Sequence, residues 1–408
     1  MAFVPSARSQ ALQQQLTEFM TTRVLPNEAR WLAENHRLNG HGDWQRWRLL
    51  PELQALKQEA REQGLWNLFL PDAQLGGGLT TLEYAPLAEI MGHSLLAPEL
   101  FNCNAPDTGN MEVLYHFGSP QQQARWLTPL LAGTLRSVFC MTEPDVASSD
   151  ATNMAATIER DGDELVLNGH KWWSTGLGHP DAGIAIFMGL CDPDAERHRR
   201  HAMVLVPLDT PGVTIERMLT ACGDYDAPYG HGQVRFDQVR VPADHLIKGW
   251  GEGFAIAQGR LGPGRIHHCM RCLGAAERSL ALMIERGQQR SAFGRPLLKL
   301  GGNLEKVAEA RIAIEQARLL TLQAAWKIDN HGVRAAMTDI AAIKVVAPRV
   351  LQQVVEMAIQ LFGGAGLCQD HPLMGFYAQA RALRLADGPD EVHLASVAKL
   401  ELKRRGQA

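Results

Sequence analysis

The sequence predicts an α+β protein with three successive parts: an N-terminal α-helical domain (1–135), a middle antiparallel β-barrel-like domain (136–247) and a C-terminal four-helix bundle (248–408). Three observations predict this order. Apolar residues recur at helical spacing in the first part, short β-branched runs alternate with turn dipeptides in the second, and helical spacing returns in the third. A length of 408 residues suits two or three domains.

In the first part, residues 51–70 and 120–133 carry apolar side chains at helical spacing. Ser119-Pro120 suits an N-cap followed by a proline in the first helical position. In the middle part, candidate strands are separated by Asp161-Gly162 and Asn168-Gly169, two dipeptides typical of tight turns. Further candidate strands are the runs at 202–208, 213–218 and 233–242.

The C-terminal part contains four long candidate helices, the number that a bundle requires. They cover residues 273–287, 304–326, 343–361 and 391–403. The clearest is 343–361, where one apolar stripe continues for about five turns. Pro348 lies inside this stripe and should bend the helix.

Composition excludes several classes of protein. Hydrophobic residues make up 46% and charged residues 21%, as in ordinary globular domains. Forty Lys and Arg against 44 Asp and Glu argue against a nucleic-acid binder. No apolar run reaches the length of a membrane span, and the N-terminus lacks the layout of a signal peptide, so we expect a cytoplasmic protein. Seven cysteines without framework spacing predict reduced thiols and no metal site, and helix packing is favoured over redox or zinc chemistry for Cys269 and Cys272.

Four segments have compositions that do not suit simple packing. Hydroxyls and carboxylates crowd residues 139–153, although a polar capped loop is an alternative. Trp172 and Trp173 are adjacent on a strand, so they should point to opposite faces, and either one ring stacks on a planar ligand or both are packed. The other two segments are 290–294 and 360–393, whose arginine, glycines and carboxylates could bind a ligand. The alternatives are that the arginine is solvated, that the glycines end a helix as its C-cap, and that the carboxylates cap the start of a helix.

In combination these segments resemble the acyl-CoA dehydrogenase family, and the resemblance covers essentially the whole chain in the same order. The motifs are T-E-P at 142–144, K-x-W-x-T at 171–175, R-x-x-F-G at 290–294, Q-x-x-G-G-x-G at 360–366 and an acid-Gly pair at 387–388. The amino-acid sequences of residues 143–153, 261–272 and 384–393 are similar to those of a subgroup that in animals is fused behind a phosphotransferase-like domain.

The resemblance implies an acyl-CoA substrate, bound FAD, electron-transfer flavoprotein as electron acceptor, and a homodimer or homotetramer in which Arg290 and the 360–364 loop hold a neighbouring subunit's FAD. The residues implied to contact FAD are Phe139, Met141, Thr142, Ser148, Ser149, Trp173, Ser174, Thr175, Arg290, Phe293, Gln360, Gly363, Gly364, Pro389 and Glu391. Those implied to contact the acyl-CoA are Ser149, Thr175, Pro263, Gly264, Arg265, Ile266 and Gly388.

The catalytic base of the family is a Glu before the glycine that Gly388 matches, and here that position holds Asp387. The family's other base position is Gly264, which cannot accept a proton. Asp390 and Glu391 are more simply explained as residues that favour the start of the final helix. An Asp oxygen lies roughly 1.5 Å short of a Glu oxygen, so two relatives stay open as alternatives: a nitroalkane oxidase, which also uses an Asp base, and a flavin-bearing DNA-protection protein, which requires a basic face such as 403–405.

Overall fold

The computed structural model describes residues 3–406, and the chain divides into two compact units. The first, called the sheet unit here, comprises residues Glu34–Glu62 and Asn102–Leu261. The second, called the helical unit, comprises the described residues up to Ala33, Gln63–Phe101 and the described residues from Gly262 on. Each unit therefore combines segments that are distant in the sequence.

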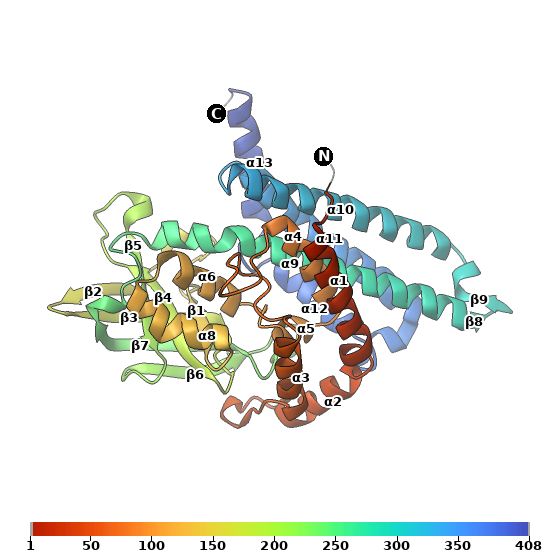
Figure 1. Cartoon of the computed structure of the whole chain (residues 1–408), viewed down its shortest axis with the longest axis horizontal. Helices are drawn as coiled ribbons and strands as arrows, with labels where there is room; N and C mark the ends of the chain where they lie inside the picture. Colours follow the sequence, from red (N-terminus) through yellow and green to blue (C-terminus); the bar gives the residue numbers. More distant parts are fainter. Residues whose placement is uncertain (1–2, 407–408) are drawn as a thin grey trace. The chain divides into compact units, whose positions relative to one another are not determined.

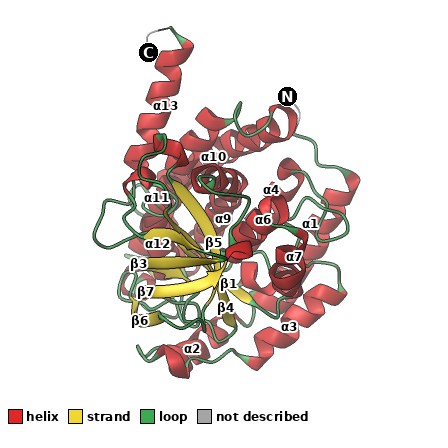
Figure 2. Ribbon diagram, turned by 90° about the vertical axis from the view of Figure 1, so that its left-hand side faces the viewer, coloured by secondary structure: helices red, strands yellow, loops and turns green. Residues whose placement is uncertain are grey.

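The sheet unit is built on one seven-stranded sheet, whose strands fan across one another in a twisted surface (Figure 2). Its strands follow the order β1-β4-β2-β3-β7-β6, and β5 pairs with β4. Most neighbours are antiparallel, whereas β4 pairs with β1 and β2 in parallel. The strands are β1 (Arg136–Cys140), β2 (Thr157–Asp161), β3 (Glu164–Thr175), β4 (Ala182–Leu190), β5 (His201–Pro207), β6 (Val213–Leu219) and β7 (His231–Pro242).

Alternating residues of these strands fill the core of the sheet unit. Phe187 of β4 and Phe236 of β7 lie with ring centroids 4.7 Å apart, and both rings are buried. Val204 of β5 and Trp47, which precedes the helix that begins at Pro51, belong to the same cluster. Burying such side chains stabilises the unit by about 1.5–3 kcal/mol for each large side chain.

The turn expected at Asn168-Gly169 is wrong, because β3 runs through this dipeptide from Glu164 to Thr175. The pairing with β7 shifts register between Leu167 and Gly169, where β7 has one extra residue, so the dipeptide continues the strand opposite a bulge of β7 in place of forming a hairpin. A Cβ on Gly169 would lie 2.3 Å from the Cβ of Ala156, which explains a glycine within a strand. The other turn is confirmed, since Gly162 has a φ of +61° between β2 and β3.

The helices before the sheet are α1 (Ala7–Phe19), α2 (Glu28–Asn39), α3 (Pro51–Glu62), α4 (Thr81–Met91), α5 (Ala97–Leu100), α6 (Asp107–Phe117), α7 (Pro120–Gln122) and α8 (Thr128–Ala132). The capping expectation at Ser119 is confirmed, because its hydroxyl accepts a hydrogen bond from Gln122 N and the Gln122 side chain returns the contact. No helix in the described range is both long and apolar enough to cross a membrane.

The C-terminal helices are α9 (Gly253–Gln289), α10 (Asn303–His331), α11 (Met337–Phe362), α12 (Leu373–Leu383) and α13 (Asp390–Arg404) (Figure 1). Four of them contain the four predicted helices, and α12 is an additional helix that the sequence pattern did not indicate. Within the helical unit, α11 packs against α10, α12 and α13. Its apolar stripe is buried, and the helix continues on both sides of Pro348. It is therefore the central element on which the neighbouring loops are held.

Candidate functional site

Two of the sequence motifs meet in the sheet unit through a buried ion pair. Lys171 Nζ on β3 donates to Glu143 Oε1 at 2.7 Å, and the two side chains are 0% and 4% exposed. The same ammonium donates to the carbonyls of Met141 and Met188. Glu143 in turn accepts from the backbone N–H groups of residues 155 and 156. Burial lowers the pKa of Lys171 to about 8, and the Glu143 carboxylate opposes that change.

These contacts fix the loop that follows β1. Trp172 N donates to the Thr142 carbonyl at 3.0 Å, so the T-E-P segment lies against the K-x-W-x-T strand. Ser148 Oγ accepts from Glu143 N at 2.9 Å and closes the loop on itself, while Ser149 is exposed. Phe139, at the end of β1, carries the Arg260 guanidinium 4.0 Å above its ring. The structure thus brings the predicted residues 139–149 and 172–175 together.

Trp173 projects out of β3 because the strand is irregular there. Its φ is +51°, and the register with β7 shifts between Lys171 and Ser174. The Trp173 side chain is 42% exposed, and its ring lies 5.6 Å from the ring of His231, on β7. Thr175 Oγ1 lies 3.0 Å from His231 Nδ1. An exposed indole in a left-handed conformation is uncommon, and it provides a flat apolar surface beside a hydroxyl group.

In the helical unit, the R-x-x-F-G motif forms a β-hairpin of β8 (Ser291–Ala292) and β9 (Arg295–Pro296). Phe293 at its tip is 95% exposed, with a φ of +50°. The end of α9 before the hairpin contacts the end of α11, because the Arg286 guanidinium lies 5.4 Å from the Phe362 ring. The hairpin therefore lies near the Q-x-x-G-G segment, where Gln360, Gly363 and Gly364 are all exposed.

Asp387 lies in the loop between α12 and α13 with a φ of +54°. Its carboxylate Oδ2 is 3.4 Å from His268 Nε2 on α9. Its backbone carbonyl accepts from Arg265 Nη2, also on α9, at 3.3 Å and from His393 Nε2 on α13 at 3.1 Å. Burial, together with the neighbouring Arg265 and Lys344, lowers the pKa of His393 to about 4, so this ring is neutral near pH 7 and donates from Nε2.

Side chains from α11 hold the two ends of this loop. The Lys344 ammonium, 1% exposed, donates to the carbonyls of Leu383 and Ala386, which places a cation at the C-terminus of α12. At the other end, Asp390 Oδ2 accepts from Arg349 Nε at 3.0 Å and from Arg384 Nε at 2.9 Å. Asp390 does begin α13, but its buried carboxylate pairs with two arginines in addition to favouring the helix start.

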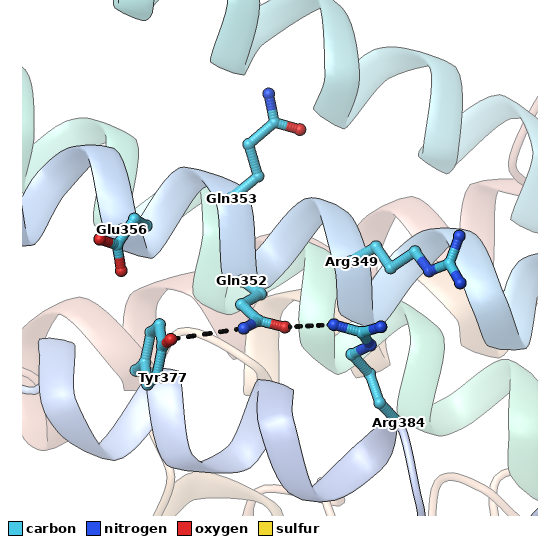
Figure 3. Close-up of a pocket in the computed structure, with 6 residues that line it drawn as sticks. All are labelled: Arg349, Gln352, Gln353, Glu356, Tyr377 and Arg384. Atoms are coloured by element: carbon cyan, nitrogen blue, oxygen red, sulfur yellow. Dashed lines mark hydrogen bonds between the residues drawn. The ribbon is translucent and has the colours of Figure 1, made fainter. Parts of the chain in front are cut away.

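A cavity of about 330 Å³ lies beside this loop, between α11 and α12 (Figure 3). In it, Gln352 lies between two polar groups: its Oε1 accepts from Arg384 Nη1 at 2.9 Å, and its Nε2 lies 3.4 Å from the Tyr377 hydroxyl. Arg349, Gln353 and Glu356 complete the lining. None of the predicted site residues lines this cavity.

The other predicted residues lie in three places. Gly264 and Ile266 are on α9, and the Ile266 side chain is fully buried, while the side chain of Pro263 lies outside the described part of the structure. Gly388 follows Asp387 with a φ of +96°, and a Cβ there would lie 3.0 Å from His393 Nε2. Pro389 is the N-cap of α13, and Glu391 is exposed in its first turn.

Sequence reasoning missed several polar groups around these residues. Glu143 and Lys171 were recognised only as members of sequence motifs, without a role of their own. No role was predicted for four further residues: His231, His268, Lys344 and His393. The sequence could have indicated only the pairing of Glu143 with Lys171, because these oppositely charged residues lie in two motifs of one predicted domain. The partners of the other four become visible only when distant segments pack together.

The structure shows the state and the surroundings of the cysteines. All seven cysteines, each within the described range, are free. Cys269 and Cys272 are buried on α9, and burial raises the pKa of both thiols, that of Cys272 to about 12, so neither is a nucleophile near pH 7. Between residues 3 and 406, no group of three or more His, Cys, Asp or Glu side chains is arranged to hold a metal ion.

Comparison with known proteins identifies the class. Models of the N-terminal, middle and C-terminal domains of acyl-CoA dehydrogenases match residues 6–134, 138–239 and 251–402. Mycobacterium tuberculosis FadE2, described as a probable acyl-CoA dehydrogenase, is 52% identical over 405 residues, which cover 99% of this chain and 98% of that protein. Mouse acyl-CoA dehydrogenase family member 10 is 52% identical over 401 residues, 97% of this chain. The chain spans only 37% of that relative and about half of the family member 11 proteins.

Solved structures agree with this result. A Mycobacterium abscessus protein assigned to the acyl-CoA dehydrogenases superimposes with a TM-score of 0.96 at 59% identity, over 98% of this chain and all of that one. Butyryl-CoA dehydrogenase from Megasphaera elsdenii gives 0.81 at 25% identity, over 98% and 100%. The chain belongs to the acyl-CoA dehydrogenase family. FAD is the cofactor of this family, and a glutaryl-CoA dehydrogenase of the same fold from Mycobacterium smegmatis was solved in complex with FADH2.

The residues on both units suit FAD. Trp173 and Phe293 expose aromatic rings that can lie against a planar ligand. No heavy atom lies within 4 Å of a Cβ built on Gly363 or Gly364, so a ligand can approach the backbone there. The Arg290 guanidinium and the Gln360 amide are exposed donors, as a diphosphate requires.

Proposed function

We propose that this protein is an acyl-CoA dehydrogenase that converts the saturated acyl chain of a CoA thioester to the trans-2-enoyl-CoA. The observation that carries the proposal is the Asp387 carboxylate, which stands before Gly388 in the loop that precedes the final helix and lies 3.4 Å from His268 Nε2. Membership of the family and the names of the relatives support an acyl-CoA substrate.

The reaction requires a base and a hydride acceptor. The α-proton of a thioester is weakly acidic, so its removal needs a carboxylate held at the carbon and donors at the thioester oxygen. We assign the proton to an Asp387 carboxylate oxygen. When bound, FAD supplies the acceptor for the hydride from the β-carbon. Thr175 and Trp173 would orient that cofactor, and Arg265 and Ser149 would hold the acyl-CoA.

The loop geometry explains how a short Asp can serve as the base. Asp adopts a left-handed conformation more readily than most non-glycine residues. Here side chains of α9, α11 and α13 all donate hydrogen bonds to carbonyls of residues 383–387. These contacts hold the backbone of the loop in place and therefore determine the position of the Asp387 Cα, from which the carboxylate extends. A backbone shift of this kind can compensate for the missing methylene, whereas a misplacement of about 1 Å without compensation costs roughly a hundredfold in rate.

We extend the proposal to the partners. Arg290 and the 360–364 segment would hold the FAD of a neighbouring subunit, which requires a homodimer or homotetramer with one FAD per subunit. Electron-transfer flavoprotein would then accept the electrons, as part of fatty-acid β-oxidation in the cytoplasm. A high yield of peroxide during turnover in air would instead assign the role of acceptor to oxygen.

One alternative has an observation in its favour. An Asp base suits a nitroalkane oxidase, and the formation of an aldehyde and nitrite from nitroethane would identify that activity. The DNA-protection alternative gains no such support, because Arg404 and Arg405 both pair with Glu401 and so the basic run is partly neutralised.

The test is anaerobic reduction of the flavin by a panel of acyl-CoA thioesters, followed by turnover with a dye acceptor. Asp387→Asn should retain FAD and bind acyl-CoA but reduce its flavin several orders of magnitude more slowly, since an amide cannot accept the proton. Asp387→Glu should keep part of the rate, and Glu391→Gln, at an exposed acid four residues away, tests the competing carboxylate. Reduction of Asp387→Asn at the parent rate, with loss of the rate in Glu391→Gln, would show that Asp387 is not the base.

A further inference from the structure

The α9 segment 265–271 presents three cationic or titratable side chains toward one side of the helix. Arg265, His268 and Arg271 are spaced three residues apart, so they lie on neighbouring turns of one face. The first contacts the Asp387 carbonyl and the second contacts its carboxylate. The third, Arg271, is 4% exposed and reaches back to His268. The segment therefore forms a chain of contacts that ends on the proposed base.

The contact between Arg271 and His268 determines where the histidine proton lies. Arg271 Nη2 is 3.1 Å from His268 Nδ1. A guanidinium nitrogen only donates hydrogen bonds, so Nδ1 must accept with its lone pair. A neutral imidazole then carries its single proton on Nε2, and Nε2 is the atom that faces Asp387 Oδ2 at 3.4 Å. The Arg271 guanidinium thus donates to His268, and the Nε2–H of His268 faces the Asp387 carboxylate.

We propose that His268 is a positioning residue for Asp387: its Nε2–H, fixed in that tautomer by Arg271, selects the carboxylate rotamer. This inference rests on the proposed function, since it assigns His268 a task only if Asp387 is the base. The Asp387 side chain is 26% exposed, so without a partner its carboxylate could turn toward water and away from a substrate. An N–H group that faces the carboxylate favours the rotamer that keeps the two groups together.

Several charged and titratable groups face Asp387 and will contribute to its titration. From α9 these are Arg265, His268 and Cys269, from α11 it is Lys344 through the Ala386 carbonyl, and from α13 it is His393. His268 faces the carboxylate oxygen, and a substitution can remove its ring while the contacts to the Asp387 carbonyl remain.

The experiment compares His268→Leu with His268→Gln in the FAD-loaded protein. Leucine removes the donor, whereas the Gln amide nitrogen can take the place of Nε2 and restore it. We expect His268→Leu to reduce flavin about 10- to 100-fold more slowly at saturating acyl-CoA, with little change in KM. The acidic limb of its pH–rate profile should move to higher pH, since loss of a donor raises the pKa of a carboxyl group. His268→Gln should recover most of the rate and the original limb.

Controls separate this inference from the proposed function and from misfolding. His331→Leu, at an exposed histidine of α10 that contacts Trp326, should behave like the parent. FAD content and thermal midpoints establish that each variant is folded. If Asp387→Asn reduces flavin normally, the proposed function fails. If Asp387→Asn is inactive but His268→Leu keeps the parent rate and pH profile, or if His268→Gln is as slow as His268→Leu, the positioning role is wrong.

Discussion

Replacing Lys171 by Met tests the buried ion pair that joins the two motifs of the sheet unit. Methionine has a similar length and volume but no charge, so the change isolates the ammonium group. It leaves the Glu143 carboxylate, 4% exposed, with only the backbone donors of residues 155 and 156. It also leaves the carbonyls of Met141 and Met188 without this donor.

The expected loss is large because the surviving charge stays out of water. Removing one partner of a buried pair costs about 3–5 kcal/mol, and a typical protein has only 5–15 kcal/mol of unfolding free energy. The double variant Lys171→Met/Glu143→Gln leaves no uncompensated charge, so it should be more stable than Lys171→Met alone. The resulting coupling free energy between the two positions should be about 1–3 kcal/mol.

Urea denaturation monitored by Trp fluorescence and by flavin release measures these losses. Arg240→Met is the matched control, because Arg240 forms exposed ion pairs with Asp161 and Glu164 on the same sheet, and such pairs contribute little. Lys171→Met should also release FAD at lower urea than the control, since residues 141–143 and 171–175 depend on the pair for their positions. Additive losses in the double variant would refute the reasoning, because two uncoupled residues cannot fix one another.

Two further predictions concern buried carboxyl groups. Burial raises the pKa of Glu112 to about 8, although the nearby Arg260 opposes this shift, and one carboxyl oxygen has no hydrogen-bond partner in the described structure. The folded state therefore keeps a proton on Glu112 that the unfolded chain releases above about pH 4.5. The contribution of this group to the unfolding free energy is thus full below that pH and falls as the pH rises toward 8. Between pH 5 and pH 8 the parent should lose on the order of a few kcal/mol of unfolding free energy through this group, and Glu112→Gln should not show this loss. Denaturation at both pH values measures the difference, and an equal dependence of the unfolding free energy on pH in parent and variant would contradict the prediction. Asp390→Asn should lower the free energy of unfolding by roughly 1–3 kcal/mol, a range that allows for the partial exposure of its two arginine partners. The variant should also reduce flavin more slowly while FAD stays bound. An unchanged rate would show that the Asp390 contacts do not hold the Asp387 loop.

The order of helices and strands was predictable because each element carries its own periodicity. The long stripe of α11 and the alternation in β7 predicted their structures from local spacing alone. The predicted turn at Asn168-Gly169 was wrong because the dipeptide can also continue a strand opposite a bulge, and only the neighbouring Ala156 and β7 decide between the two. Helix α12 was not indicated, since its short apolar pattern becomes a helix when packed on α11.

The sequence by itself determined which residue types are available for the site: an acid before Gly388, a Trp and a Thr on one strand, and an Arg and glycines near helix ends. Only the tertiary structure decided how they are held. Lys171 is paired with Glu143, 28 residues away, and Asp387 is surrounded by Arg265, His268 and His393 from two helices. The physical reason is that periodicity reports only which face of an element is buried, whereas hydrogen bonds and ion pairs depend on distances between elements that no local pattern encodes.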